Sequence, residues 1–133
     1  MNGAETNKRT VTILLVEDED VLLDLIKIVL EGKGFRVLPA RDGLEAVEIF
    51  SRHRDEIDVV ISDMGLPKLG GWEAFLKMKE IRSNINVILA SGYFDQDLKA
   101  EMVKAGAKDF IQKPYDLDEI AEKIREVISK PNG

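Results

Sequence analysis

Hydrophobic residues follow two alternating patterns along this chain. Short apolar runs rich in Val, Ile and Leu are typical of strands buried on both faces, and they predict strands at 11–16, 35–38, 58–63, 86–90 and 109–112. Between these runs apolar residues recur every three or four positions, which predicts amphipathic helices. The helices carry apolar stripes at 22–30 and 46–50 and extend over about 71–82, 96–105 and 117–129.

Residues at the helix ends support this division. Gly34 suits the end of the first helix, since glycine is common just after helix C-termini. Asp42 followed by Glu45 has the spacing of a capping box. Asp116, with Glu119 three residues later, is expected to cap the last helix.

Five strands alternating with five helices define the expected fold class, which is α/β. The alternation requires a doubly wound parallel sheet with helices on both faces and right-handed crossovers. The flavodoxin-like strand order 2-1-3-4-5 suits a five-stranded sheet best, and it gives a three-layer α/β sandwich. We expect one domain over residues 8–130, with residues 1–7 and 131–133 as flexible termini.

Composition excludes several classes of protein. The net charge of -6 argues against a surface that binds nucleic acid directly. The chain has no cysteine, which excludes a disulfide scaffold, a thiolate metal site and a cysteine nucleophile. No apolar run approaches the roughly 20 residues that a membrane-spanning helix needs, and the polar residues 1–10 lack the apolar core of a signal peptide. We therefore expect a cytoplasmic protein that does not bind a membrane.

Acidic residues end the first and third predicted strands. Asp63 ends the third, and Gly65 and Pro67 then turn the chain into a loop. Glu17 and Asp18 end the first, so three carboxylates meet where the strand order reverses, which is where open α/β sheets bind ligands. A simpler interpretation makes Asp18, Asp20 or Asp63 a helix cap. A cap explains one acid rather than the cluster, and the helix after Asp63 begins too far away.

Clustered carboxylates repel one another unless they are protonated or bridged by a cation. Oxygen ligands suit a hard cation, and Mg²⁺ is typically held by one or two carboxylates with waters and phosphate oxygens. Asp63 could then act as a nucleophile, because carboxylates form aspartyl phosphates. Lys113, at the end of the fifth strand, offers a second positive charge, and the Ser91 hydroxyl can donate to a phosphoryl oxygen.

Four short motifs occur in order on the expected elements: LLVED at 14–18, SDMGLP at 62–67, ASG at 90–92 and AGAKDFIQKP at 105–114. Together they resemble the receiver domain of response regulators in bacterial two-component signalling, of the chemotaxis-regulator type. The resemblance covers about residues 9–129. It implies a phosphoprotein of a phosphorelay, in which a histidine kinase or histidine phosphotransfer protein phosphorylates Asp63 in the presence of Mg²⁺ or Mn²⁺.

The same resemblance implies a metal site. Asp18 and Asp63 would bind the ion directly, together with the backbone carbonyl of Gly65, and Glu17 would act through water. Glu17 stands where the family most often has Asp, which adds a methylene and keeps the carboxylate.

The resemblance also implies a conformational switch. Lys113 matches the phosphate-binding lysine, and Gly92 matches a small position that leaves room beside the phosphoryl group. Ser91 matches the switch hydroxyl, which is more often Thr, and Phe110 matches the aromatic switch residue. Phosphorylation is expected to draw Ser91 inward and to let Phe110 turn into the vacated space. A downstream protein would bind the changed surface, formed by residues 96–105, 109–112 and 117–129.

Three other functions compete with this one. Haloacid-dehalogenase-like phosphatases usually carry a second Asp two residues after the nucleophile, where Gly65 stands here. A flavodoxin-like FMN site needs a phosphate-binding loop after the first strand, where residues 17–20 are acidic. A degenerate receiver that only binds partners would not need the retained site residues. We expect a signalling phosphoacceptor and not an enzyme acting on a separate substrate. Sequence leaves open the cognate kinase, the phosphoryl lifetime, a homodimer, and whether the receiver stands alone or belongs to a larger protein.

Overall fold

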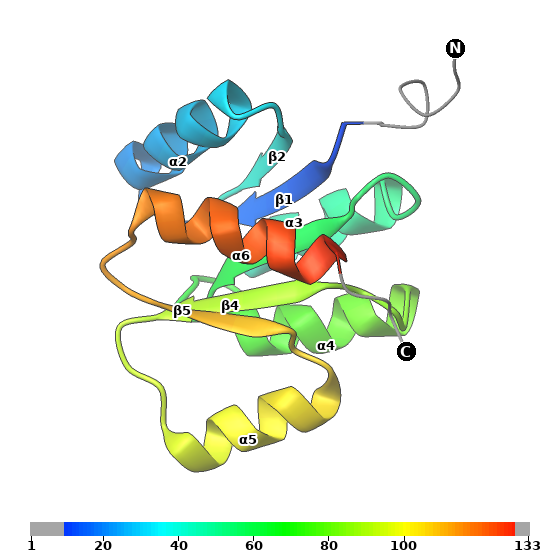
Figure 1. Cartoon of the computed structure of the whole chain (residues 1–133). Helices are drawn as coiled ribbons and strands as arrows, with labels where there is room; N and C mark the ends of the chain where they lie inside the picture. Colours follow the sequence, from blue (N-terminus) through cyan, green and yellow to red (C-terminus); the bar gives the residue numbers. More distant parts are fainter. Residues whose placement is uncertain (1–9, 130–133) are drawn as a thin grey trace.

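The computed structural model describes residues 10–129, so the predicted flexible termini at 1–7 and 131–133 lie outside the described part of the chain. Within it, five strands alternate with five helices (Figure 1). The strands are β1 (Thr12–Val16), β2 (Arg36–Ala40), β3 (Val59–Asp63), β4 (Val87–Ser91) and β5 (Asp109–Gln112). The helices are α2 (Asp20–Gly32), α3 (Gly43–Arg52), α4 (Gly71–Ile81), α5 (Gln96–Ala105) and α6 (Leu117–Ser129). No helix among these residues is long and apolar enough to cross a membrane.

The sheet has the predicted order, β2-β1-β3-β4-β5, and every neighbouring pair is parallel. Strand β1 lies between β2 and β3, with Leu14 in register with Leu38 on one side and Val60 on the other. The order therefore reverses between β1 and β3, and the predicted flavodoxin-like fold class is confirmed.

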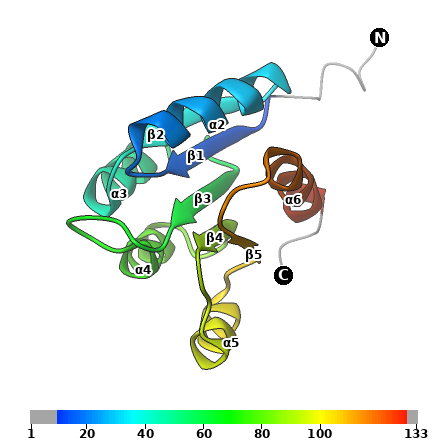
Figure 2. The same cartoon turned by 90° about the vertical axis from the view of Figure 1, so that its left-hand side faces the viewer.

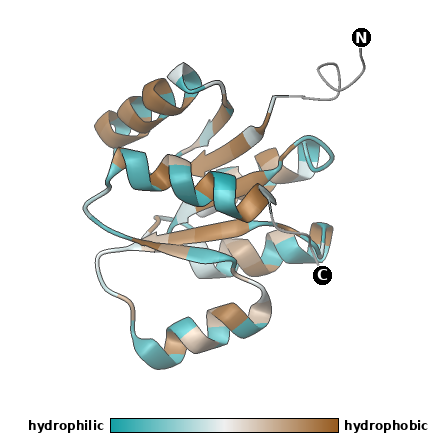
Figure 3. Ribbon diagram, in the orientation of Figure 1, coloured by the Kyte–Doolittle hydropathy of each residue, from teal (hydrophilic) through white to brown (hydrophobic). Residues whose placement is uncertain are grey.

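Helices cover both faces of the sheet, which gives three layers (Figures 1 and 2). Helices α2 and α6 pack on one face over a cluster of buried residues that includes Ile13, Leu15, Leu23, Ile26, Ile61, Ile111, Ile120 and Ile124. Helices α3, α4 and α5 contribute to the cluster on the other face, which includes Leu14, Phe50, Val60, Phe75, Met78, Leu89 and Met102. The three central strands β1, β3 and β4 are hydrophobic over most of their length (Figure 3), because side chains on both of their faces are removed from water.

Strand β2 is longer than predicted. The sequence indicated a strand over 35–38, and the structure continues it through Pro39 to Ala40. Proline lacks the N–H that a central strand needs, but β2 lies at the edge of the sheet and pairs only with β1. Pro39 is tolerated there, in register with Leu15.

The predicted helix caps are confirmed. The Asp42 carboxylate accepts a hydrogen bond from the Glu45 N–H at 2.8 Å, at the start of α3. The Asp116 carboxylate accepts one from the Glu119 N–H at 3.2 Å, at the start of α6. Gly34, two residues after α2, has a φ of 97°, a backbone conformation that glycine adopts without strain.

Helix α5 is the least embedded of the helices, which accounts for its weak hydrophobic periodicity. Met102 is its one fully buried residue, and Val103 is 55% exposed. Figure 2 shows α5 at the β5 end of the sheet, away from α2 and α3. The helix is nevertheless defined at its start, where the Asp95 carboxylate accepts a hydrogen bond from the Leu98 N–H at 3.0 Å.

Helix α4 begins in direct contact with the end of β3. A Cβ placed on Gly71 would lie 2.2 Å from the backbone oxygen of Asp63, so only glycine fits there without a shift of the backbone. The N-cap of α4 is Gly70, and Asp63 does not cap this helix. The prediction that the helix after Asp63 begins too far away for Asp63 to cap it is confirmed.

Candidate functional site

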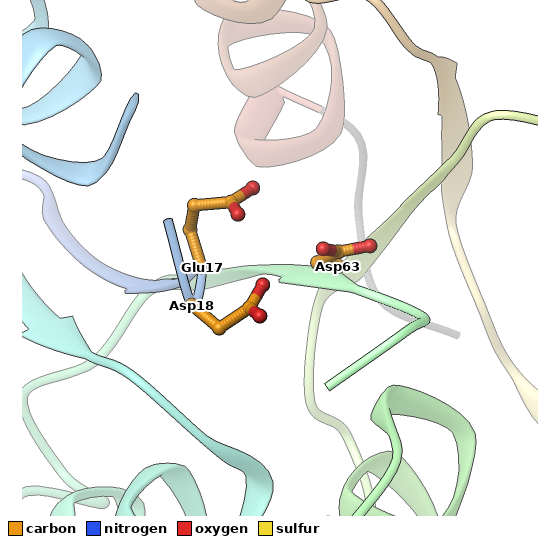
Figure 4. Close-up of side chains that lie close together, drawn as sticks. All are labelled: Glu17, Asp18 and Asp63. Carbon is orange, nitrogen blue, oxygen red and sulfur yellow. The ribbon is translucent and has the colours of Figure 1, made fainter. Parts of the chain in front are cut away.

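Three acids meet at the carboxyl ends of β1 and β3. Val16 is in register with Ser62, so the residues that follow, Glu17 and Asp63, lie side by side at the ends of the two strands. Each of Glu17, Asp18 and Asp63 offers a carboxylate oxygen, and these atoms all lie within 4.8 Å of one another. Figure 4 shows the three carboxylates directed toward a shared space. The structure therefore brings together the three acids that the sequence selected.

Burial differs among the three acids. Glu17 is completely buried, Asp63 is 6% exposed and Asp18 is exposed. Burial raises the pKa of the Glu17 carboxyl above its usual value, and the nearby charge of Asp63 acts in the same direction. Hydrogen bonds from the Glu19 N–H and the Tyr115 hydroxyl oppose this rise without cancelling it.

Lys113 extends from the end of β5 into the acidic cluster. Its Nζ lies 3.2 Å from Oδ2 of Asp63 and 3.6 Å from Oε1 of Glu17. Burial lowers the pKa of the ammonium group, but the hydrogen bond to Asp63 and the charges of both acids outweigh it, so the pKa is raised overall. The lysine is thus held in its charged form beside two carboxylates.

The orientation of the Asp63 carboxylate is fixed from two sides. The N–H of Gly65 donates to Oδ1 at 3.2 Å, and Lys113 donates to Oδ2 at 3.2 Å. Gly65 therefore lies beside Asp63 and contacts it through its backbone N–H, whereas the role predicted for its backbone carbonyl as a metal ligand stays a prediction. Each carboxylate oxygen keeps lone pairs for a further partner.

Tyr115 is a site residue that the sequence analysis did not select. Its hydroxyl donates to Oε1 of Glu17 at 2.9 Å, and its ring lies 5.3 Å from Nζ of Lys113. A polar aromatic residue two positions after the strand-end Lys113 was the available signal. Sequence alone does not show that its ring turns back toward the first strand.

Ser91 lies at the end of β4, but its hydroxyl is engaged by the following loop. It donates to the backbone oxygen of Tyr93 at 2.8 Å and accepts from the Tyr93 N–H at 3.3 Å. Beside it, a Cβ on Gly92 would meet no heavy atom within 4 Å, so there is open space at this position. The side-chain amide of Gln112 donates a hydrogen bond to the Gly92 backbone oxygen at 2.7 Å.

Phe110 belongs to a small aromatic cluster on β5 and the loop before α5. Its ring meets that of Phe94 edge to face, with centroids 5.2 Å apart. Nζ of Lys99, on α5, lies 4.9 Å from the Phe110 centroid. Phe110 is half-buried in this arrangement, and it connects β5 to α5.

The donor set suits a hard divalent cation. Carboxylate and carbonyl oxygens are the ligands that such ions prefer. Acids gathered this closely need a positive partner, because like charges at short distance repel one another. Lys113 supplies one positive charge against the three carboxylates, which leaves an excess of negative charge in the crevice.

Fold and site together define a flavodoxin-like domain with an acidic crevice at its topological switch point. A family model of the response regulator receiver domain matches residues 13–125. The chain belongs to this family, whose members are signalling domains of two-component systems. The resemblance found in the sequence is therefore confirmed.

Individual relatives agree with this assignment. The chain is 33% identical to sporulation initiation phosphotransferase F of Bacillus subtilis (strain 168), over 87% of this chain and 92% of the relative. It is 34% identical to sensor kinase CckA of Brucella abortus (strain 2308), over 90% of this chain but 13% of the relative. The chain is thus similar both to a protein of about its own length and to one segment of a far longer kinase.

A solved structure shares the fold closely. The crystal structure of a CheX-CheY-BeF3-Mg+2 complex from Borrelia burgdorferi contains a chain that matches this one with a TM-score of 0.87 at 28% identity. The match covers 96% of each chain. That complex contains BeF3 and Mg+2.

Proposed function

We propose that this receiver domain is a phosphoacceptor of a two-component phosphorelay and that Asp63 is the residue phosphorylated. One observation carries the proposal: the Glu17, Asp18 and Asp63 carboxylates lie within 4.8 Å of one another, and the Lys113 ammonium lies 3.2 Å from Asp63. Acids that hold a cation, together with a fixed lysine, suit the transfer of an anionic phosphoryl group.

Mg²⁺ or Mn²⁺ is the cofactor that this donor set favours. Asp18 and Asp63 would bind the ion directly, the Gly65 carbonyl would complete the protein ligands, and Glu17 would act through water. A bound ion would neutralise charge that develops on the phosphoryl oxygens. The magnesium in the similar Borrelia complex supports this assignment.

A phosphohistidine on a histidine kinase or a histidine phosphotransfer protein would supply the phosphoryl group. A carboxylate oxygen of Asp63 forms the new O–P bond as the P–N bond of the donor breaks. The imidazole leaves with the electrons of that bond and takes up a proton. The Gly65 N–H and Lys113 hold the Asp63 carboxylate during this exchange, which limits the reorganisation that the transfer requires.

After transfer, three residues would stabilise the phosphoryl group. Lys113 would shift from the carboxylate to a phosphoryl oxygen, forming a charge-assisted hydrogen bond. The Ser91 hydroxyl would leave the Tyr93 carbonyl and donate to a second oxygen. The open space beside Gly92 would accommodate the added group.

The movement of Ser91 would alter the surface formed by α5, β5 and α6. The Ser91 hydroxyl is hydrogen-bonded to the backbone of Tyr93, and the ring of the next residue, Phe94, packs on Phe110. Pulling Ser91 inward would strain this loop and let Phe110 turn toward the vacated space. A downstream protein partner would recognise the result, because a local charge event biases the poorly embedded α5.

The competing functions have less support. A phosphatase of the haloacid-dehalogenase type would need a second acid where Gly65 stands, and within residues 10–129 every helix covers the sheet and none forms a cap over the crevice. A receiver instead would act on its own phosphoryl group, assisting its transfer and its hydrolysis. The cytoplasmic location, a homodimer and the domain limits 8–130 stay predictions of the sequence.

Intact-mass measurement tests the proposal. The protein is incubated with acetyl phosphate and Mg²⁺, alongside Asp63→Asn, a Mg²⁺-free sample, and Asp24→Asn as a control at an exposed acid on α2. We expect one phosphoryl adduct in the parent and in Asp24→Asn, and none in the other two samples. An adduct that persists in Asp63→Asn at the parental level would overturn the proposal.

A further inference from the structure

We propose that Tyr115 is a positioning residue that holds the Glu17 carboxylate in place for the metal ion. This inference rests on the proposed function, since it takes the acidic crevice to be a Mg²⁺ site. Tyr115 would not touch the ion or the phosphoryl group, and it would act through Glu17.

Tyr115 contacts two charged groups of the site at once. Its hydroxyl donates to Oε1 of Glu17 at 2.9 Å, and its ring lies 5.3 Å from the Lys113 ammonium. The chain's other tyrosine, Tyr93, has its side chain in solvent and is 77% exposed. The Tyr115 hydroxyl is therefore placed by the fold to bond a buried acid.

The position of Tyr115 is fixed by packing of its ring and by the backbone that follows it. The ring packs against the cluster of buried residues beneath α2 and α6. The backbone directly after it is fixed by the Asp116 cap, whose carboxylate accepts from the N–H of Asp118 at 3.0 Å and of Glu119 at 3.2 Å. A ring fixed in this way gives its hydroxyl a defined direction.

Glu17 needs such support more than a shorter acid would. The extra methylene, compared with Asp, adds a rotatable bond to a side chain that must place its carboxylate correctly. One oxygen is held by the Glu19 N–H at 3.1 Å, and the other by Tyr115. Without the hydroxyl, Oε1 would keep only Lys113, at 3.6 Å.

Loss of the hydroxyl should therefore let the carboxylate turn toward Lys113. Glu17 would then present a different face to a metal-bound water. Substitution of groups that orient metal ligands typically weakens metal binding by about 10-fold to 100-fold. Because Glu17 acts through water, we expect an effect near the lower limit.

Calorimetric Mg²⁺ titration tests this role. Tyr115→Phe, which removes only the hydroxyl, should raise the Kd for Mg²⁺ by about tenfold. Tyr93→Phe is the matched control and should bind Mg²⁺ like the parent. If the parent binds no Mg²⁺, the proposed metal site fails; if the parent binds and Tyr115→Phe binds equally well, only the role of Tyr115 fails.

A double-mutant cycle separates action through Glu17 from a general structural effect. In a Glu17→Gln background, Tyr115→Phe should change the Kd for Mg²⁺ by less than about twofold. An undiminished tenfold loss in that background would overturn the inference.

The metal-free protein gives an independent readout. With ¹³C-labelled glutamate, the carboxyl resonance of Glu17 should shift in Tyr115→Phe and stay in place in Tyr93→Phe. A lower melting temperature for Tyr115→Phe, with an unchanged carboxyl resonance and unchanged Mg²⁺ affinity, would reduce Tyr115 to a purely structural residue and overturn the inference.

Discussion

At the scale of single residues, the buried carboxylate of Glu17 lowers the stability of the folded protein at neutral pH. The carboxylate is completely buried beside Asp63, and burial raises its pKa above the usual 4.5. The folded protein therefore binds a proton on Glu17 more tightly than the unfolded chain does. Its stability falls as the pH rises from 4.5 through the folded-state pKa, where the buried group becomes charged.

Glu17→Gln should consequently stabilise the metal-free protein at neutral pH. The neutral amide can still accept from the Glu19 N–H, and it can donate to the Tyr115 hydroxyl. We expect the free energy of unfolding to rise by on the order of 1 kcal/mol, because the substitution removes a buried charge that serves function rather than stability. Urea denaturation in the presence of a chelator measures this change.

The pH dependence provides the control for that prediction. The advantage of Glu17→Gln should shrink as the pH falls through the folded-state pKa of Glu17 toward 4.5, and it should stay small below 4.5, where Glu17 is protonated in the parent in both states. A variant that is less stable than the parent at neutral pH would contradict our view of Glu17 as a destabilising acid.

Lys113 should affect Mg²⁺ binding and phosphorylation differently. Its ammonium lies 3.2 Å from Asp63 and competes with a metal ion for the same carboxylate. Lys113→Gln should therefore bind Mg²⁺ at least as tightly as the parent, while phosphorylation slows by at least about tenfold because a charge that stabilises the transferring group is lost. Calorimetry and the rate of adduct formation measure the two effects.

Lys27→Gln is the matched control, since Lys27 pairs with Glu31 on the surface of α2. It should leave both quantities unchanged. If Lys113→Gln instead weakened Mg²⁺ binding and left the phosphorylation rate intact, the assigned role of Lys113 would be wrong.

At the scale of elements, the junction of β3 and α4 places Asp63. Gly71→Ala would put a Cβ 2.2 Å from the Asp63 backbone oxygen, so the two elements must separate. We expect a loss of about 1–3 kcal/mol in unfolding free energy, together with slower phosphorylation. Chemical denaturation gives the first quantity and intact mass over time gives the second.

Gly65→Ala tests whether the effect is specific to this contact. A Cβ at Gly65 meets no heavy atom within 4 Å. The unfolding free energy of the Gly65→Ala variant should therefore stay within about 0.5 kcal/mol of that of the parent. Equal destabilisation by the two substitutions would show that the packing of α4 on β3 is not the cause.

The β4–α5 loop is the element through which the switch would act. Ser91→Ala removes the hydroxyl that bonds Tyr93, and it leaves Asp63 and the acidic cluster in place. We expect Asp63 to be phosphorylated still, with much smaller ¹H–¹⁵N chemical-shift changes over α5, β5 and α6 on addition of beryllofluoride. Changes as large in Ser91→Ala as in the parent would contradict the switch.

Sequence periodicity was enough to predict every element within residues 10–129, because the strands are buried on both faces and the helices on one. The end of β2 was missed since tolerance of Pro39 depends on its edge position, which is a property of the sheet. Tyr115 was missed for a similar reason. Its contact with Glu17 joins residues 98 positions apart, and no local pattern encodes the direction of a ring.

At the scale of the whole molecule, topology creates the site. The reversal of strand order brings the ends of β1 and β3 together, and β5 contributes Lys113 to the same edge. The strand-end residues could therefore be assigned to one crevice from the sequence. The side-chain arrangement within it, such as the turn of Ser91 toward Tyr93, depends on packing that only the structure shows.

The most direct test of the central claim locates the phosphoryl group on the chain. After treatment with acetyl phosphate and Mg²⁺, borohydride reduction converts an aspartyl phosphate to homoserine, and peptide mass mapping then identifies the reduced position. Our account predicts homoserine at position 63 alone. Reduction at Glu17, Asp18 or another acid, with Asp63 unmodified, would contradict it.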